Sequence, residues 1–273
     1  MQSLLNKVVV ITGASSGIGR STAVEAAGRG AKLVLAARNY SALEETAALC
    51  GPTAQGISLF KADISLELDC KALIQHAIDE FGQIDILVNN AGISMRALFL
   101  ETDLIVIKKV MDINFWGTVY CTKYALPHLL KSHGSVVGVS SIAGRKGLPG
   151  RTGYSASKFA MQGFLEALRI EHLHDGLHVL MAFPGFTASN IRQTALSSDG
   201  SQQGESPREE GKMMQSSAVA VYLLNAVEKR KRTLTLTAQG KLTVWLNTFL
   251  PAMVDRMVFN HMANEPDAPI KKR

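Results

Sequence analysis

An α/β fold, with a parallel sheet wound by helices on both faces, is predicted by three features of the chain. Short β-branched runs alternate with longer helical patterns over most of its 273 residues. A glycine-rich turn follows the first run directly and opens a helical pattern. Polar or small residues follow several later runs, and the carboxyl ends of parallel strands meet at one edge of a sheet. A ligand site is therefore expected at that edge.

The composition is that of a folded globular protein. Hydrophobic residues make up 47% of the chain and charged residues 19%. The length suffices for one large domain with a sizeable core. Much of the net charge of +6 is local to two basic runs, residues 229–232 and 271–273, so a nucleic-acid-binding surface is not expected.

The cysteines, the N-terminal residues and the length of the apolar stretches indicate the cellular compartment. Cys50, Cys70 and Cys121 are odd in number and widely spaced, without a metal-ligand pattern, so free thiols in a reducing compartment are expected. A strand pattern begins at Lys7, so no signal peptide is predicted. No stretch reaches about 18 uninterrupted apolar residues, the length that would indicate a transmembrane helix. We expect a cytoplasmic protein.

Seven strands separated by helices are expected. The first strand, Lys7–Thr12, is a continuous apolar run, as in strands buried on both faces. The other strands are Ala31–Ala37, Ile57–Ala62, Ile84–Val88, Gly134–Ser141, His178–Phe183 and Thr233–Thr237. The helices are Ile18–Arg29, Tyr40–Cys50, Leu66–Phe81, Leu104–Leu130, Arg151–His174 and Ser216–Glu228. Residues 1–240 are expected to form a single domain.

The glycine-rich turn suits the binding of a dinucleotide. Gly13 permits the tight turn, Gly17 lets the backbone approach a pyrophosphate, and Gly19 lets the helix pack against the strand. The N–H groups at the helix N-terminus are donors for phosphate. The alternative is a purely structural turn. The predicted binding turn also contains Ser15, Ser16 and Ile18.

The residue after the second strand bears on the choice of cofactor. Where an NAD-binding unit carries a carboxylate for the ribose 2′-hydroxyl, this chain has Ala36-Ala37-Arg38. Arg38 can bind a 2′-phosphate bidentately, and Arg20 could add a second positive charge. The alternative for Arg38 is a solvated loop side chain. Asp63, after the third strand, is suited either to an adenine amine or to capping a helix.

A tyrosine and a lysine four residues apart are the candidate catalytic pair. Tyr154 and Lys158 fall on one face of a helix, with Ser141 thirteen residues before the tyrosine. A nearby ammonium is expected to lower the pKa of the phenol, which could then exchange a proton with a substrate oxygen that Ser141 holds. Asn114 lies within a helix, where it is either satisfied by the helix itself or placed at a kink that aims it at the site.

Together these residues resemble the short-chain dehydrogenase/reductase family over roughly residues 6 to 240. The matching motifs are Thr12-Gly-Ala-Ser-Ser-Gly-Ile-Gly19, Asn89-Asn-Ala-Gly92, Asn114, Ser141, Tyr154-x-x-x-Lys158 and Pro184-Gly185. The resemblance implies a Rossmann-like, doubly wound parallel sheet of seven strands and a nicotinamide cofactor. The implied catalytic set is Asn114, Ser141, Tyr154 and Lys158. Arg38 matches the members that prefer NADP(H).

The resemblance also implies where the cofactor binds and what reaction follows. The further cofactor-binding residues would be Asn90, Ala91, Gly92, Pro184, Gly185 and Thr187, together with Tyr154 and Lys158. Ser189 stands where the family often has a threonine. NADPH would give a hydride to a carbonyl carbon, Tyr154 a proton to the oxygen, and Asn114 would hold a water that links Lys158 to solvent. The alternative is a catalytically idle nucleotide-binding module that acts as an interaction protein.

Two segments depart from a minimal member of the family. Residues 189–217 are polar and are expected to form either a substrate lid or a surface insertion. Residues 241–273 form an extension with apolar residues at helical spacing over Gly240–Asn264, kinked at Pro251. It is expected to cover the pocket or a partner, with peripheral membrane contact as the second interpretation. A homodimer or homotetramer is expected, and the extension resembles that of hydroxysteroid-type members, which suggests an apolar substrate.

Overall fold

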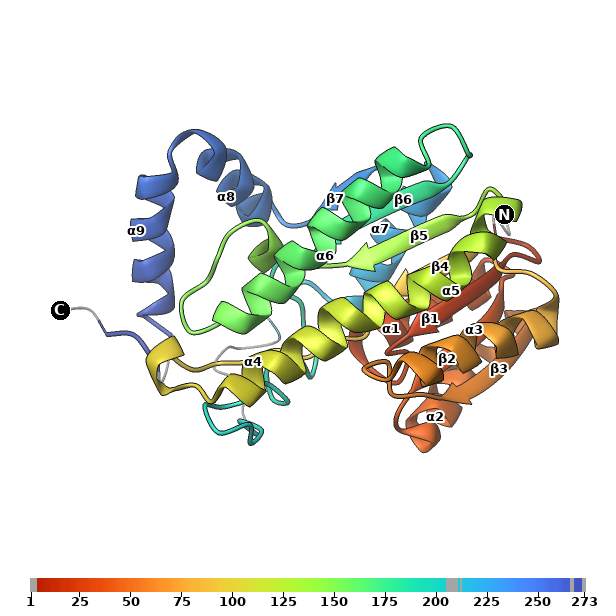
Figure 1. Cartoon of the computed structure of the whole chain (residues 1–273), viewed down its shortest axis with the longest axis horizontal. Coiled ribbons are helices and arrows are strands. Elements are labelled where there is room, and N and C mark those ends of the chain that lie inside the picture. The colour runs from red at the N-terminus through yellow and green to blue at the C-terminus, as the bar shows by residue number, and fades with distance from the viewer. Residues whose placement is uncertain (1–3, 205–210, 212, 266–267, 272–273) are drawn as a thin grey trace.

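A computed structural model describes residues 4–204, 211, 213–265 and 268–271. Within them, seven strands form one parallel sheet in the order β3-β2-β1-β4-β5-β6-β7 (Figure 1). The strands are β1 (Val8–Thr12), β2 (Lys32–Ala37), β3 (Gly56–Lys61), β4 (Ile86–Asn89), β5 (Ser135–Val139), β6 (His178–Phe183) and β7 (Thr233–Thr235). The predicted doubly wound, seven-stranded fold is confirmed.

Helices cover both faces of the sheet. One face carries α1 (Gly17–Gly28), α2 (Tyr40–Cys50) and α7 (Ser216–Glu228), and the other carries α3 (Glu67–Phe81), α5 (Gly117–Lys131) and α6 (Thr152–Glu171). The side chains of β1 alternate between two apolar cores: Val9 and Ile11 pack with the first set of helices and Val10 with the second. Each such fully buried side chain contributes about 1.5–3 kcal/mol of hydrophobic stabilisation, which explains the continuous apolar run of β1.

The strand order reverses at β1. β1 pairs with β2 on one side and with β4 on the other, so the helices that follow β1 and β4 leave toward opposite faces. Such a reversal leaves a crevice at the carboxyl ends of the two strands, which is where α/β proteins bind ligands. The glycine-rich turn lies between β1 and α1, at this crevice.

The helix predicted over Leu104–Leu130 is interrupted. It consists of α4 (Leu104–Met111), a π-helical turn (Asp112–Trp116) and α5. Asn114 lies in the π-helical turn and is fully buried. Of the two alternatives for Asn114, the helix is locally distorted here, and such turns are frequent at functional sites.

The C-terminal extension forms two helices, α8 (Ala238–Phe249) and α9 (Pro251–Met262), instead of one continuous helix. The break lies at Leu250, whose φ and ψ of −132° and 54° are not helical, and Pro251 begins α9, where its missing N–H costs no hydrogen bond. The predicted kink is thus a complete break. In Figure 1, α9 stands apart from the helices that cover the sheet. Its Asp255 forms an ion pair with Lys146.

Candidate active site

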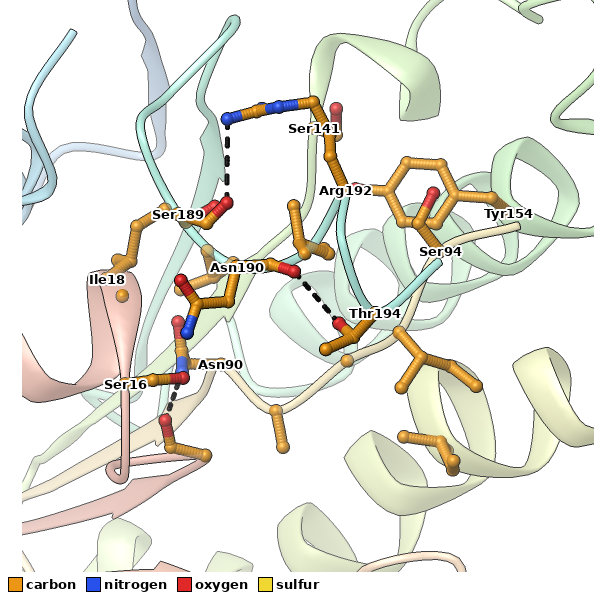
Figure 2. Close-up of a pocket in the computed structure, with 18 of the residues that line it drawn as sticks. Ser16, Ile18, Asn90, Ser94, Ser141, Tyr154, Ser189, Asn190, Arg192 and Thr194 are labelled. Atoms are coloured by element: carbon orange, nitrogen blue, oxygen red, sulfur yellow. Dashed lines mark hydrogen bonds between the residues drawn. The ribbon is translucent and has the colours of Figure 1, made fainter. Parts of the chain in front are cut away.

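A cavity of about 500 Å³ opens at the strand reversal. It is lined by the β1–α1 turn, by residues at the ends of β2, β4 and β5, by the start of α6 and by part of the segment 184–202. Segments far apart in the sequence therefore meet at this cavity (Figure 2). The predicted lid contributes to this lining through residues 189–202; its residues 205–210 and 212 lie outside the part of the chain that the structure describes.

The turn between β1 and α1 has the shape that phosphate binding requires. Gly13 and Gly17 have φ angles of 65° and 52°, a left-handed region that favours glycine. At Gly17 a Cβ atom would lie 3.2 Å from the Cβ of Ser189, across the cavity mouth. Ser16, the N-cap of α1, makes no capping hydrogen bond, and the first turn of α1 contains no acidic residue. The helix N–H groups therefore suit phosphate oxygens of a dinucleotide.

Gly19 packs against the β1–α1 turn and does not line the cavity. A Cβ atom there would collide with the carbonyl oxygen of Gly13, so glycine allows α1 to begin directly against the turn. Asn90, which follows β4, stabilises the same turn. Its Nδ2 donates to the carbonyl oxygens of Thr12 and Gly13 at 2.9 and 3.2 Å. The predicted packing role of Gly19 fits this geometry, while cofactor contact by Gly19 does not.

Two basic residues near the turn differ in their environment. The Arg38 side chain is exposed at the end of β2 and lines the cavity. Arg20 is turned away: its Nη2 donates to the carbonyl oxygen of Ser15 at 2.7 Å and to the carboxylate of Glu45 at 3.0 Å. The prediction that Arg20 adds a second positive charge at the site is therefore wrong, because this arginine braces the turn against α2.

Asp63 lies at the other end of the cavity, after β3. Its Oδ1 accepts hydrogen bonds from the N–H and the hydroxyl of Ser65, at 3.0 and 2.7 Å. The N-cap of α3 is Leu66, so Asp63 forms a local turn without capping that helix. Asp63 also lines the cavity, and its predicted role toward an adenine amine stays a prediction.

Tyr154 and Lys158 both line the cavity from the first turns of α6. Tyr154 is 7% exposed and Lys158 is 2% exposed. The Nζ of Lys158 donates to the carbonyl oxygen of Val139 at 2.9 Å, at the end of β5, and lies 5.9 Å from the centroid of the Tyr154 ring. Burial lowers the pKa of Lys158 to about 8.

Burial raises the pKa of Tyr154, and three groups oppose this shift in part. They are the hydrogen bond with the Ser141 side chain and the positive charges of Arg151 and Arg192. The prediction that Lys158 lowers the pKa of the phenol stays a prediction: its ammonium lies over the Tyr154 ring and donates to the carbonyl oxygen of Val139.

Ser141 and Asn114 differ in their position relative to the cavity. Ser141 follows β5 and lines the cavity, and its Oγ also accepts a hydrogen bond from the N–H of Ala143 at 3.2 Å. Asn114 does not line the cavity. Its Oδ1 accepts from the N–H of Ile93 at 2.8 Å, and its Nδ2 donates to the carbonyl oxygen of Ile93 and to the hydroxyl of Ser157, both at 2.9 Å. Asn114 therefore fixes the segment after β4 to α6.

The segment after β6 supplies the opposite wall. Pro184 and Thr187 line the cavity, whereas Gly185 does not. A Cβ atom on Gly185 would lie 2.7 Å from the Oγ1 of Thr237, so this glycine permits close packing against the start of α8 and is not expected to contact a cofactor. The Thr187 hydroxyl donates to the carbonyl oxygen of Gly185 at 3.2 Å, which fixes its side chain at the cavity wall.

Two arginines of the cavity were not predicted from the sequence. Arg151 directly precedes α6, and its Nη1 donates to the hydroxyl of Ser94 at 3.1 Å. Arg192, from the segment after β6, donates through Nη2 to the carbonyl oxygens of Thr187 and Ser189, at 2.9 and 3.5 Å (Figure 2). Arg151 is three residues before Tyr154, and this closeness in sequence could have revealed it. Arg192 lies in an irregular segment without such a signal.

Among the described residues, no group of three or more histidine, cysteine and acidic side chains is placed to hold a metal ion. Within the same residues, the helices are too short or too polar for any of them to cross a membrane.

Comparison with known proteins places the chain in a family. A family model described as short chain dehydrogenase matches residues 7–199. The mouse protein "Dehydrogenase/reductase SDR family member 7B" is 36% identical over 268 residues, 96% of this chain and 83% of that protein. The sesame (Sesamum indicum) protein "11-beta-hydroxysteroid dehydrogenase A" is 34% identical over 97% of this chain and 79% of its own length.

A solved structure agrees at the level of the fold. An alcohol dehydrogenase from the archaeon Thermococcus sibiricus, complexed with 5-hydroxy-NADP, superposes with a TM-score of 0.73 at 22% identity, over 84% of this chain and 95% of that one. At this identity the likeness concerns the fold alone. The family match and the mouse and sesame relatives carry the assignment: the chain belongs to the short-chain dehydrogenase/reductase family of oxidoreductases, which use nicotinamide cofactors.

Proposed function

We propose that the protein is an NADP(H)-dependent oxidoreductase that interconverts a carbonyl and a secondary alcohol on a small molecule with an apolar part. The observation that carries this proposal is the convergence of Ser141, Tyr154 and Lys158 on one cavity, beside a glycine turn with open helix N–H groups. A protein that only binds a nucleotide has no use for a buried tyrosine and lysine at this place.

The cofactor would be held along the edge of the sheet. The N-terminus of α1, with Ser15, Ser16 and Ile18, would bind its phosphates, and Arg38 would bind a 2′-phosphate. Asp63 lies where an adenine would be expected, and Asn90, Ala91 and Gly92 would flank the ribose. At Gly92 a Cβ atom would lie 3.4 Å from the Nζ of Lys158, so glycine keeps the lysine accessible from this side. Pro184 and Thr187 would contact the nicotinamide end.

Proton transfer falls to Tyr154. When bound, the reduced nicotinamide supplies the hydride that adds to the carbonyl carbon and is itself oxidised. The Tyr154 hydroxyl donates its proton to the carbonyl oxygen, and the Ser141 hydroxyl orients that oxygen, which becomes the alcohol. Positioned acid catalysis of this kind contributes about 10²- to 10⁴-fold in rate. Because its pKa is raised, Tyr154 stays protonated at neutral pH, which favours reduction.

Lys158 would return the proton to the tyrosine. A lysine with a pKa of about 8 is mostly charged at neutral pH but gives up its proton more readily than an exposed lysine. Asn114 is a positioning residue in this scheme, since its side chain binds Ile93 and Ser157.

The exposed apolar side chains of α8 and α9 support contact with a second copy of the chain. Trp245, Phe249 and Met257 are 61%, 66% and 51% exposed. A homodimer or homotetramer would bury them, and peripheral membrane contact is the second proposal, supported by the basic run at residues 229–232. Light scattering after size-exclusion chromatography tests whether the protein is an oligomer. Flotation with anionic phospholipid vesicles tests membrane contact.

The enzymatic proposal is tested by following NADPH absorbance with a panel of apolar ketones and aldehydes. We expect consumption of NADPH with formation of the matching alcohol, and slower turnover with NADH. Tight binding of NADPH without turnover of any carbonyl compound would favour the interaction-protein alternative.

A further inference from the structure

One segment of the chain joins the two proposed catalytic hydroxyl groups. It comprises residues 142–151, between Ser141, which follows β5, and the first turn of α6, which carries Tyr154. The segment folds back onto α6, because the N–H of Leu148 donates to the hydroxyl of Ser155 at 3.2 Å, and Leu148 also lines the cavity. The conformation of the segment therefore determines how Ser141, Leu148 and Tyr154 lie relative to one another.

Lys146 lies in the middle of this segment with a nearly buried charge. Its side chain is 11% exposed, and among the described residues Asp255 of α9 is the only acidic side chain in ion-pair contact with its ammonium. A buried ammonium that loses its only carboxylate is strongly disfavoured and has to move toward water. The Asp255 carboxylate is 68% exposed, so solvent screens the pair in part. Asp255 thus holds Lys146, and with it the middle of the segment, in place.

The C-terminal extension meets the same segment a second time, after α9. A Cβ atom on Gly150, whose φ is 70°, would lie 2.8 Å from the Cγ of Pro269, so the two backbones pack closely. The carbonyl oxygen of Gly150 accepts a hydrogen bond from the N–H of Ala97 at 3.0 Å. The neighbouring Arg96 forms an ion pair with Glu265 at 3.7 Å. The end of the segment is therefore packed between the chain after β4 and the chain after α9.

α9 also contacts the wall of the cavity that follows β6. The rings of Phe186 and His261 lie 6.2 Å apart between centroids, and Phe186 lines the cavity. Val254 and Met262 of α9 are 2% and 4% exposed, and their spacing of eight residues places them on one helix face together with His261. This face is turned toward the protein body. α9 therefore bridges two parts of the chain that line the cavity.

We propose that Asp255 is a positioning residue for the active site: through its ion pair with Lys146 it fixes the segment between Ser141 and Tyr154, so that both hydroxyl groups meet the substrate carbonyl. This inference rests on the proposed oxidoreductase function. Asp255 does not line the cavity, so it acts only through Lys146. A charge-assisted hydrogen bond changes an equilibrium by about ten- to a hundredfold, and the exposure of Asp255 places the expected effect at the lower end.

The kinetic test compares Asp255→Asn with the wild type, using NADPH and a ketone that the wild type reduces. We expect kcat/KM to fall by about tenfold, mainly through kcat, because the segment orients the hydroxyl groups that act on the reacting oxygen. The dissociation constant of NADPH should change by less than about twofold. Asp255→Glu, which keeps the carboxylate, should retain most of the activity. Arg256→Gln, an exposed position on α9 beside Asp255, is the matched control and should behave as the wild type.

A double-mutant cycle shows whether Asp255 acts through Lys146. In the Lys146→Met background the ammonium is absent, so Asp255→Asn should have almost no further effect on kcat/KM. An equal loss in both backgrounds would overturn the inference. A role in stability alone would also overturn it, since Asp255→Asn would then lower the melting temperature without changing kcat/KM well below that temperature.

Hydrogen exchange measured by mass spectrometry tests the contact without any substrate. The N–H groups of Arg145 and Lys146 donate to the carbonyl oxygen of Ile142 at 2.9 and 3.0 Å, so they are protected in the wild type. Peptides that cover residues 142–151 should exchange faster in Asp255→Asn and at the wild-type rate in Arg256→Gln. Peptides from α5 should not change in either variant.

Unchanged exchange in this segment, or a kcat/KM of Asp255→Asn close to that of the wild type, would overturn the inference while leaving the enzymatic function standing. Faster exchange in a protein that reduces no carbonyl compound would overturn the proposed function, and the positioning role with it.

Discussion

Lys158 and Tyr154 are both buried, with the ammonium 5.9 Å from the centroid of the phenol ring. Burial disfavours the charged form of each group, so it raises the pKa of Tyr154 and lowers that of Lys158 to about 8. The pKa of Lys158 therefore lies below that of Tyr154, the reverse of the order for exposed groups. With this order, transfer of a proton from the Lys158 ammonium to a Tyr154 phenolate is favourable.

The shifted pKa of Lys158 makes stability depend on pH. An unfolded lysine titrates near 10.5 and the folded Lys158 near 8, so between these values the unfolded state binds the extra proton. The free energy of unfolding should therefore rise through this interval, by on the order of 3 kcal/mol. Urea unfolding of the wild type and Lys158→Met, from pH 7 to 10.5, measures this as a change in their difference in stability.

The control for this measurement is Lys123→Met, which removes an exposed lysine of α5. Its difference from the wild type should not vary with pH. A constant difference between wild type and Lys158→Met over the same interval would show that Lys158 titrates as an exposed lysine does.

Replacement of Asn114 should destabilise the fold as well as the site. Asn114→Leu keeps the approximate size but leaves the N–H and carbonyl groups of Ile93 without their side-chain partner. Each partly buried polar group left unsatisfied costs about 1–3 kcal/mol, so we expect a loss of at least about 2 kcal/mol in the free energy of unfolding. A loss below about 0.5 kcal/mol would mean that the π-helical turn is held by other contacts.

Arg38 should determine the cofactor preference. Arg38→Ala is expected to weaken binding of NADPH by about tenfold and to leave NADH almost unchanged, because only NADPH carries the 2′-phosphate. The contact is exposed, so added salt should reduce the difference. Fluorescence titration with both cofactors measures it, with Arg256→Ala as control. Equal weakening of both cofactors would assign Arg38 to the fold or to the adenine.

The three cysteines should be unreactive in the native protein. Cys50, Cys70 and Cys121 are buried, and burial raises the pKa of the Cys50 thiol to about 11, so little thiolate forms near neutral pH. A chromogenic disulfide reagent should titrate three thiols only after denaturation, and neither a reducing agent nor a chelator should alter activity. Rapid reaction of a native thiol, or loss of activity on chelation, contradicts this expectation.

Features that depend on residue spacing within a short stretch of the chain were predicted correctly from the sequence. The alternation of strands and helices, the glycine turn, and the placement of Tyr154 and Lys158 on one helix face follow from periodicity and from turn chemistry. The poor helix propensity of Asn114 made a local distortion one of two alternatives, and the structure contains it. Each of these signals lies within a few residues of the feature that it predicts.

Other features depend on contacts between distant segments. Arg192 reaches the site because the chain after β6 folds back over the cavity, and Arg20 leaves it because Glu45 and Ser15 bind it. The pKa of Tyr154 depends on burial and on which charges surround it, and these are set by tertiary packing. Spacing alone therefore did not reveal that Ser141, Arg151 and Arg192 also lower the pKa of Tyr154.

The central claim is that Tyr154 donates the proton during carbonyl reduction with NADPH. Tyr154→Phe removes only the phenolic oxygen and its proton from a side chain that is otherwise buried in place. The most direct test is the single-turnover rate of NADPH oxidation by wild type and variant, with a ketone that the wild type reduces. We expect the rate to fall by about 10²-fold or more while the dissociation constant of NADPH changes by less than about threefold. A rate near that of the wild type would contradict the account.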